Sequence, residues 1–293
     1  MCPLCSEIKF NFIGKPKISK KVESIVRLDY SIVQCTSCSF YYISPKLDLT
    51  SAEWQILYDD EYFEPMTNWH FIKREQDLSQ RFNNLNKFTS HKVKRFLDVG
   101  WGEGYGLIKA ANMGWESYGI DISDLRIPEA KADKINFVQS DLISAKFQEN
   151  YFDCVYVDSV LEHVPNPLEL LCELKRITSK GGTIYIGVPN EDSLFTKVLQ
   201  IAYKLSGRSE ESSRLKPFAP PFHIGGFTKD SLQFAIKKSG LSINKLRNFA
   251  SKSDILNYNI LSRGFFIAAF YLPISLLAIP LRMEVYFEAY LKK

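Results

Sequence analysis

The sequence has no long run of lysine or arginine, although its 293 residues carry a formal net charge of +4. A nucleic-acid partner is therefore not expected, because such proteins usually gather basic residues into one patch. Internal repeats and low-complexity tracts are also absent. No apolar signal-peptide core precedes the early charges at Glu7 and Lys9, so we expect a cytoplasmic protein whose thiols are reduced.

The length and composition predict one large globular domain with a small appendage. With 45% hydrophobic and 24% charged residues, the chain has the composition of a soluble protein. We expect a zinc-ribbon-like module at 1–45, a helical linker or lid at 46–90 and the main domain at 91–293. The main domain is expected to contain a polar insertion at 205–222 and an apolar helical insertion at 255–281.

Four cysteines form two C-x-x-C pairs near the start of the chain. Cys2 and Cys5 make the first pair, and Cys35 and Cys38 make the second, with 29 residues between the pairs. Four thiolates are the tetrahedral set that Zn²⁺ prefers in closed structural sites. A redox dithiol or four unrelated thiols are the alternatives, but two pairs in a reducing compartment favour structural zinc.

Other residues outside the main motifs are assigned to packing. Cys154 and Cys172 lie in apolar runs and are expected in the core. The linker carries aromatic residues that we expect to pack over the main domain, namely Trp54, Tyr58, Tyr62, Phe63, Trp69 and Phe71.

A glycine-rich turn begins the main domain. Residues 96–99 predict a short buried strand, which breaks into Gly100, Gly102 and Gly104 before a helix. This arrangement brings backbone N–H groups close to a ligand with no Cβ in the way. A dinucleotide fingerprint needs Gly-x-Gly-x-x-Gly, and counting from Gly100 the third glycine is replaced by Tyr105. A glycine turn that binds nothing is the alternative.

Strands alternate with helices through the main domain, which predicts a doubly wound, mostly parallel α/β sheet. Strands are expected at 95–99, 116–120, 135–139, 152–158 and 183–188, and a helix at 167–178 that ends at Lys180-Gly181-Gly182. Every candidate polar residue falls at or just after the end of one of these strands: Asp98, Asp121, Asp141, Asp158 and Asn190. A carboxylate at Asp121 suits the two hydroxyls of a ribose.

Residues 97–190 resemble the class I S-adenosylmethionine (SAM)-dependent methyltransferases. The pattern Asp98-x-Gly100-x-Gly102-x-Gly104 resembles motif I of that family, and Leu161-Glu-His-Val-Pro165 resembles the segment after its fourth strand. His223, followed by Phe227-Thr228 before a helix, is similar to the subgroup that carries an N-terminal zinc ribbon. The resemblance implies a seven-stranded Rossmann-like sheet and SAM as cofactor.

The resemblance also implies roles for individual residues. Asp121 would bind the ribose hydroxyls, Asp141 with Leu142 would face the adenine, and Asp98 would hold the methionine ammonium beside the loop. The implied cofactor-binding set is Asp98, Gly100, Gly102, Gly104, Asp121, Ile122, Asp141, Leu142 and Asp158. Trp101 departs from the family, which has a small residue there, and its ring is expected to cover the ligand or to block it.

The predicted function is methyl transfer to an oxygen or carbon atom of a small-molecule, glycan-precursor or lipid-linked acceptor. Such an acceptor needs a base near neutral pKa, for which His163, His223 and Glu162 are the candidates. A structural hydrogen bond is an equally good assignment for His163. The rival functions are an NAD-dependent oxidoreductase and a non-catalytic SAM-fold and zinc-ribbon binding module.

The stretch 264–281 contains no charged residue over 18 positions. Pro273 and Pro280 interrupt it, and 285–291 resembles the last strand of the family sheet. We expect one or two apolar helices that pack on the domain. A peripheral membrane contact is the less favoured alternative.

Overall fold

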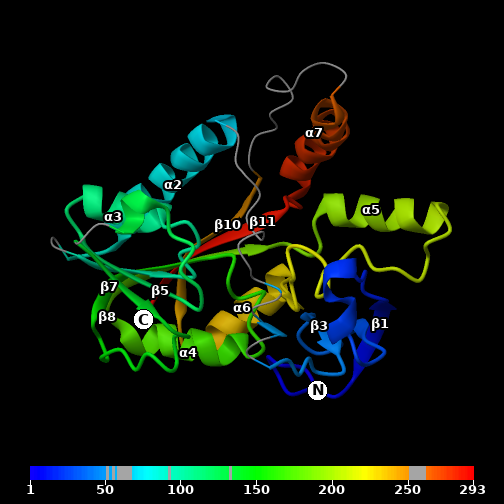
Figure 1. The fold of residues 1–293 in the computed structure, drawn as a ribbon, viewed down its shortest axis with the longest axis horizontal. Helices are drawn as coiled ribbons and strands as arrows, with labels where there is room; N and C mark the ends of the chain where they lie inside the picture. The colour runs from blue at the N-terminus through cyan, green and yellow to red at the C-terminus, as the bar shows by residue number, and fades with distance from the viewer. Residues whose placement is uncertain (51–52, 55–56, 58–67, 92–93, 132–133, 251–261) are drawn as a thin grey trace. The chain divides into compact units, whose positions relative to one another are not determined.

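The computed structural model describes residues 1–293 except for 51–52, 55–56, 58–67, 92–93, 132–133 and 251–261. The chain divides into two compact units (Figure 1). The amino-terminal unit comprises Met1–Tyr62, Pro189–Leu232 and Arg247–Phe287, and the sheet unit comprises Phe63–Val188, Gln233–Leu246 and Glu288–Lys293. Of the aromatic linker residues, Tyr58, Tyr62 and Phe63, and the side chains of Trp69 and Phe71, lie outside the described part of the chain. Trp54 packs in the amino-terminal unit, so the expectation that it packs over the main domain is wrong.

The sheet unit is built on seven strands in the order β10-β11-β8-β7-β4-β5-β6. The strands are β4 (Arg95–Val99), β5 (Glu116–Asp121), β6 (Ile135–Gln139), β7 (Phe152–Asp158), β8 (Thr178–Pro189), β10 (Ser242–Phe249) and β11 (Tyr286–Lys292). β4 pairs in parallel with both β5 and β7. The strands that follow β4 in sequence, β5 and β6, lie on one side of it, and the next strand, β7, lies on its other side. The predicted doubly wound, mostly parallel α/β sheet is confirmed.

The central strands of this sheet are apolar because both of their faces are covered. β7 is buried from Phe152 to Val157, and only its last residue, Asp158, is partly exposed. β6 is the edge strand, and its residues after Ile135 are exposed. Continuous apolar runs are typical of central parallel strands, so polar side chains in β4 and β7 are confined to special positions such as Asp98, Asp153 and Asp158.

Helices cover both faces of the sheet unit (Figure 1). α2 (Asn68–Phe88) and α3 (Tyr105–Asn112) lie on one face, and α4 (Pro167–Ile177) lies on the other. Leu78, Phe82 and Leu85 of α2 are spaced four and three residues apart, so they share one side of the helix and enter the core. Burying each such side chain contributes about 1.5–3 kcal/mol, which fixes α2 on the sheet.

Two sequence predictions in this unit were wrong. Lys180-Gly181-Gly182 does not end a helix, because α4 ends at Ile177 and β8 begins at Thr178. The register of β7 with β8 shifts here, and Gly181 takes φ +81° to accommodate the irregularity. Cys172 is exposed rather than buried, because it lies off the apolar side of α4.

The amino-terminal unit contains a four-stranded sheet of order β1-β2-β3-β9. β1 (Phe10–Gly14), β2 (Ser31–Cys35) and β3 (Tyr41–Ser44) form an antiparallel meander, interrupted by the 3₁₀ helix η1 (Lys20–Ile25), and β9 (Gly225–Gly226) pairs with β3. A segment that follows the main domain's core sequence therefore completes the sheet of the cysteine-bearing module.

The insertion 205–222 was expected to be polar, but its second half contributes buried aromatic side chains to a hydrophobic cluster. Phe218 and Phe222 are at most 1% exposed and join Val22 and Tyr30 in one hydrophobic cluster. The rings of Tyr30 and Phe218 have centroids 5.0 Å apart. The second half of the insertion is therefore part of the core of the amino-terminal unit.

Two further helices, α5 (Leu194–Leu205) and α7 (Arg263–Leu281), belong to the amino-terminal unit and contact each other. Ser193 caps the start of α5 and Ser262 caps the start of α7, each through a side-chain oxygen that accepts a backbone N–H. α6 (Lys229–Lys238) and the 3₁₀ helix η2 (Pro128–Lys131) complete the described helices. Within the described ranges, no helix is long and apolar enough to cross a membrane.

Candidate cofactor site at the carboxyl ends of the strands

The glycine loop between β4 and α3 adopts backbone conformations that side chains rarely tolerate. Gly100, Gly102 and Gly104 have φ of +73°, +53° and +88°. A Cβ on Gly100 would lie 2.5 Å from Cγ2 of Val160, and a Cβ on Gly104 would lie 2.5 Å from Cβ of Ala130. The loop is therefore a tight backbone cradle at the start of a helix, the geometry that suits close approach of a ligand.

Asp98 lies beneath this loop and is only 3% exposed. Its Oδ2 is so close to Gly106, in the first turn of α3, that a Cβ there would lie 2.2 Å from it. A carboxylate at the N-terminus of a helix is stabilised by the helix dipole. The sequence analysis assigned no role to Gly106, and the structure gives it one, since only glycine leaves room for the Asp98 carboxylate.

Asp121 ends β5 beside the loop. Its Oδ2 accepts the backbone N–H of Gly102 at 3.3 Å and its Oδ1 accepts that of Ser123 at 3.2 Å. Burial raises the pKa of Asp121, although these two hydrogen bonds act in the lowering direction. Each oxygen retains capacity for one more donor, which is what two adjacent ribose hydroxyls would supply.

The residues expected around an adenine differ in exposure. Ile122 is 49% exposed and Leu142 is 4% exposed, so only Ile122 presents its side chain openly. Asp141 accepts the backbone N–H of Ser144 at 2.9 Å. Burial acts to raise the pKa of Asp141, but hydrogen bonds with Ser144 and with nearby backbone N–H groups together outweigh burial and lower that pKa. Asp141 is therefore held as a carboxylate directly after β6.

The ring of Trp101 is buried in the sheet unit against Gly119 of β5, where any larger residue in place of the glycine would collide with the ring. The indole is 4% exposed, and a Cβ on Gly119 of β5 would lie 2.1 Å from its ring. Its ring centroid is 5.9 Å from that of Phe137, and the guanidinium of Arg126 lies 3.5 Å from the Phe137 centroid. The indole Nε1 is buried with no hydrogen-bond partner among the described residues.

Asp158 ends β7 and is held by an arginine that the sequence analysis did not select. Arg81 of α2 lies 2.6 Å from Oδ2 of Asp158, and the hydroxyl of Tyr156 donates to the same oxygen at 3.0 Å. Arg81 also lies 2.7 Å from Oε1 of the fully buried Glu288 in β11. The three charged side chains therefore tie α2 to two strands of the sheet.

The electrostatics of this network favour the charged arginine. Burial alone lowers the pKa of Arg81, but Asp158 and the neighbouring groups raise it well above its ordinary value. Burial raises the pKa of Tyr156, so that phenol remains a neutral donor. The signal in the sequence was the position of Arg81, three residues after Leu78 and four before Leu85, on the apolar side of α2.

The three candidate bases are divided between the units. Glu162 and His163 follow β7 in the sheet unit; Glu162 is 1% exposed and His163 is half-buried. The backbone N–H of His163 donates to the carbonyl of Val160 at 2.9 Å, which shapes a tight turn after the strand. His223 belongs to the amino-terminal unit, in the loop that precedes β9.

The four cysteines of the amino-terminal unit are gathered at one point. The Sγ atoms of Cys2 and Cys38 lie 3.5 Å apart, those of Cys5 and Cys35 lie 3.4 Å apart, and all four lie within 4.8 Å of one another. Zn–S bonds of about 2.3 Å in a tetrahedron place sulfur atoms about 3.8 Å apart. The spacing of the four thiols therefore fits one zinc ion.

Two matching backbone turns produce this cluster. The backbone N–H of Ser6 donates to the carbonyl of Cys2 at 3.0 Å, and that of Ser39 donates to the carbonyl of Cys35 at 3.1 Å. Ser6 and Ser39 also share a left-handed backbone, with φ of 64° and 61°. Each C-x-x-C pair thus sits in the same kind of turn, which points both thiols of the pair toward one place.

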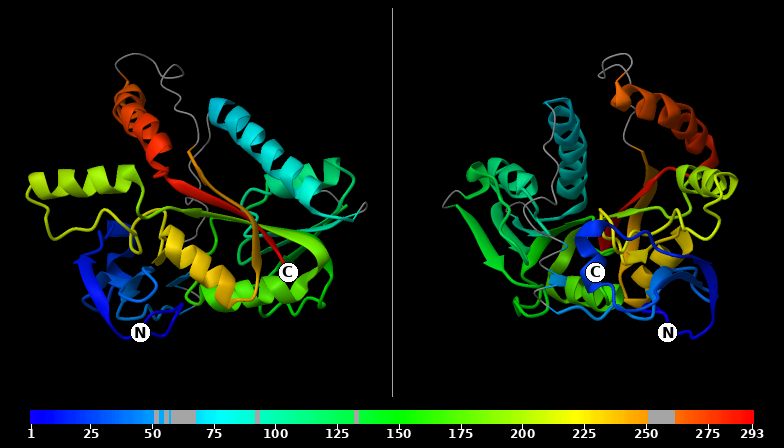
Figure 2. Two further views of the ribbon diagram at one scale, coloured as in Figure 1. Left: turned by 180° about the vertical axis from the view of Figure 1, so that it is seen from behind. Right: turned by 45° about the vertical axis from the view of Figure 1, so that its right-hand side comes forward.

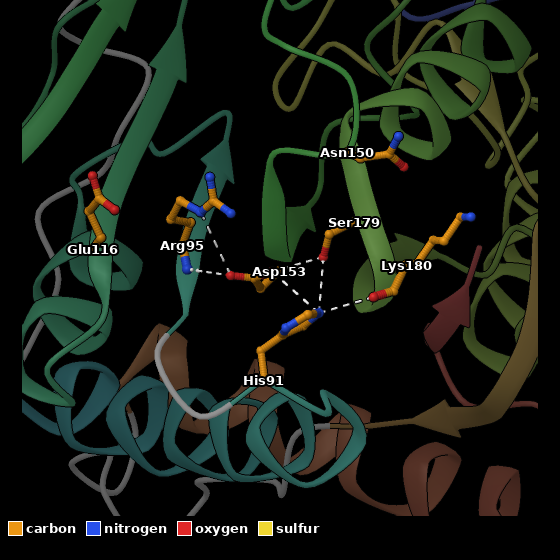
Figure 3. Close-up of a pocket in the computed structure, with 7 residues that line it drawn as sticks. All are labelled: His91, Arg95, Glu116, Asn150, Asp153, Ser179 and Lys180. Atoms are coloured by element: carbon orange, nitrogen blue, oxygen red, sulfur yellow. Dashed lines mark hydrogen bonds and ion pairs between the residues drawn. The ribbon is translucent and has the colours of Figure 1, made fainter.

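A separate pocket of about 630 Å³ lies at the opposite, amino-terminal ends of the sheet strands. Figure 3 shows its lining residues His91, Arg95, Glu116, Asn150, Asp153, Ser179 and Lys180. The buried Asp153 accepts the backbone N–H of Arg95 at 2.9 Å and the hydroxyl of Ser179 at 2.8 Å. Ligands of such sheets bind at the carboxyl ends of strands, so this pocket is not the cofactor site.

Comparison with known proteins identifies the core of the sheet unit. Residues 97–186 match a family described as "Methyltransferase domain". This stretch of the chain is similar to methyltransferase domains. It runs from β4 to β8 and includes the glycine loop and the strand ends Asp98, Asp121, Asp141 and Asp158.

Two curated relatives are similar to parts of the chain. A ubiquinone biosynthesis O-methyltransferase of Nitrosospira multiformis is 26% identical over 61% of this chain and 79% of its own length. A chloroplastic tocopherol O-methyltransferase of Arabidopsis thaliana is 32% identical over 32% of this chain and 30% of its own length. The chain thus spans most of one relative and under a third of the other.

A solved SAM-dependent methyltransferase from Archaeoglobus fulgidus is similar in fold. It superposes with a TM-score of 0.52 and 21% identity, covering 82% of this chain and all of that one. This likeness agrees with the Rossmann-like fold of the seven-stranded sheet.

Proposed function

We propose that this chain transfers a methyl group from SAM to an oxygen or carbon atom of a small-molecule, glycan-precursor or lipid-linked acceptor. The observation that carries the proposal is a left-handed glycine cradle flanked by carboxylates at successive strand ends. SAM fits these residues because Gly100, Gly102 and Gly104 of the loop carry no side chains, and because Asp121 retains capacity to accept two hydroxyl groups. The names of both curated relatives favour oxygen as the methylated atom.

Each part of SAM would meet a residue suited to it. Asp121 would accept the ribose hydroxyls, Ile122, Asp141 and Leu142 would surround the adenine, and the glycine loop would face the methionine moiety. Asp98, buried under the loop, would stabilise the ammonium group through charge. Asp158 would contribute indirectly, because Arg81 holds its carboxylate at the end of β7.

The bound sulfonium supplies an electrophilic methyl group, so the main task of the protein is alignment. Holding acceptor and methyl in line can contribute several kcal/mol of rate acceleration. A hydroxyl acceptor also has to lose a proton, and an imidazole near neutral pKa suits that step. His163 and His223 are the proposed bases, and Glu162 is the weaker candidate since it is buried.

The amino-terminal module would be a structural zinc ribbon, as in the subgroup that the sequence resembles. The four thiols have the number, spacing and closed arrangement of a structural site with no open coordination position. Zinc would then hold the turn of Cys2–Cys5 against the turn of Cys35–Cys38. Its role would be in folding rather than in methyl transfer.

A transfer assay with methyl-labelled SAM tests the proposed acceptor class. Purified protein is incubated with a cell extract, which is then separated into organic-soluble, small water-soluble and macromolecular fractions. We expect label in one of the first two fractions, and none when Asp121→Ala replaces the native protein. Asp230→Ala, which changes an exposed carboxylate of α6, is the matched control. Label in the protein or nucleic-acid fraction would contradict the proposed acceptor.

A further inference from the structure

The helices α5 and α7 form one continuous feature of the amino-terminal unit. The rings of Phe195 and Tyr271 meet edge to face with centroids 5.1 Å apart. The backbone N–H of Leu194 donates to the carbonyl of Met283 at 2.9 Å, which joins the start of α5 to the end of α7. Both helices are seen beside each other in the two views of Figure 2.

One side of α7 packs against the protein. Ala268, Ile274 and Ala278 are between 3% and 9% exposed. Their small or branched side chains allow the helix to approach its neighbours closely. This part of α7 agrees with the packing that the apolar sequence predicts.

The other side of α7 is also apolar, but it is exposed. Phe266, Phe270, Leu277 and Leu281 are 55%, 55%, 60% and 56% exposed. Their spacing of four, seven and four residues places them in one stripe along the helix. A helix on the surface of a water-soluble protein normally has polar residues on that side, so this stripe is suited to an apolar environment.

The neighbouring helix α5 presents positive charge. Lys197, Ile201, Lys204 and Leu205 are exposed and share one side of the helix, and the exposed Arg208 follows its end. No acidic residue occurs from 194 to 208 or from 263 to 282. Within these two contacting segments the charge is therefore entirely positive.

We propose that α5 and α7 together dock the protein on the surface of an anionic lipid bilayer. The stripe of α7 would enter the boundary between headgroups and acyl chains, and Lys197 and Lys204 would lie near lipid phosphates. Attachment is peripheral, in keeping with the absence of a spanning helix among the described residues. A second copy of this chain is a less suitable partner for this surface, because a symmetric contact would bring two positively charged surfaces together. The inference does not depend on methyl transfer.

Vesicle flotation of the full chain tests this proposal. We expect binding to vesicles of phosphatidylcholine with a third phosphatidylglycerol, weak binding to pure phosphatidylcholine, and loss of the difference at high salt. Phe270→Ser with Leu277→Ser should weaken binding to the anionic vesicles by at least about tenfold. Lys197→Glu with Lys204→Glu should weaken it by about fivefold or more for each lysine.

Matched variants on the same unit provide the controls. Phe10→Ser with Phe12→Ser removes exposed aromatic rings from β1, and Lys17→Glu with Lys20→Glu reverses exposed charge near η1. Neither pair should change vesicle binding. Equal binding of the α7 variant and native protein would overturn the proposal. So would a native dimer, seen by light scattering without lipid, that the α7 variant converts to monomer.

Discussion

Arg81→Met should be among the most destabilising single changes in the sheet unit. Arg81 neutralises Glu288, which is fully buried, and Asp158, whose side chain is 27% exposed. Removing the cation leaves a buried carboxylate with no opposite charge at that position, and breaking such a pair typically costs about 3–5 kcal/mol. The guanidinium also lies 5.2 Å from the ring centroid of Tyr185, so packing is lost as well.

The charge explanation makes a prediction about pH that a packing explanation does not. Without Arg81 the charged form of Glu288 is disfavoured in the folded protein, because its burial is then uncompensated. A carboxyl whose folded pKa is raised destabilises the fold above its unfolded pKa and not below it. The loss of unfolding free energy caused by Arg81→Met should therefore be largest at pH 8 and should decrease toward pH 5.

Urea unfolding followed by circular dichroism measures this effect. Arg81→Met is compared with native protein, with Arg81→Met/Glu288→Gln and with Arg208→Met, which removes an exposed arginine of the amino-terminal unit. We expect the double variant to recover about half of the loss or more, since it removes the buried charge. The reasoning would be refuted if Arg81→Met lowered the unfolding free energy no more than Arg208→Met does, or if its effect were independent of pH.

Three further predictions follow from single sites. Gly106→Ala should weaken SAM binding at least about tenfold in calorimetry, because its Cβ would lie 2.2 Å from Oδ2 of Asp98; unchanged affinity would show that this contact relaxes freely. Burial raises the pKa of Glu191 to about 7, so ionisation destabilises the fold increasingly from pH 4.5 to 7; Glu191→Gln should add about 3 kcal/mol at pH 8 and little at pH 4, by urea unfolding. Cys35→Ser should lower bound zinc, measured by elemental analysis, from one ion to well under one per chain, whereas the exposed Cys172→Ser should leave it unchanged.

The sequence was most informative where local pattern and tertiary position coincide. An apolar run that ends on an acid located β7 with the expected bounds, because a buried parallel strand tolerates polar residues mainly near its ends. The same rule selected Asp98, Asp121, Asp141 and Asp158 before any fold was known. The glycine spacing then indicated the kind of loop that joins β4 to α3.

Contacts between distant segments could not be predicted in this way. Arg81 and Glu288 are 207 positions apart, and neither residue belongs to a recognisable motif. Pairing of Gly226 with Tyr41 likewise depends on the complete fold. Cys172 was placed in the core because its neighbours are apolar, although its own direction on α4 leads to solvent.

The apolar stretch 264–281 shows a different limit. Its composition predicts a helix, but helical periodicity carries no information about which side is covered when both sides are apolar. Only the structure distinguishes the packed Ala268 and Ala278 from the exposed Phe270 and Leu277. That distinction is the basis of the membrane-docking proposal.

Titration calorimetry with SAM, S-adenosylhomocysteine and NAD⁺ tests the central claim most directly. The account predicts that both adenosyl ligands bind, that NAD⁺ does not, and that Asp121→Ala abolishes binding while Asp230→Ala leaves it intact. A folded, zinc-loaded protein that binds neither adenosyl ligand would contradict the account, and one that binds NAD⁺ alone would indicate an oxidoreductase instead.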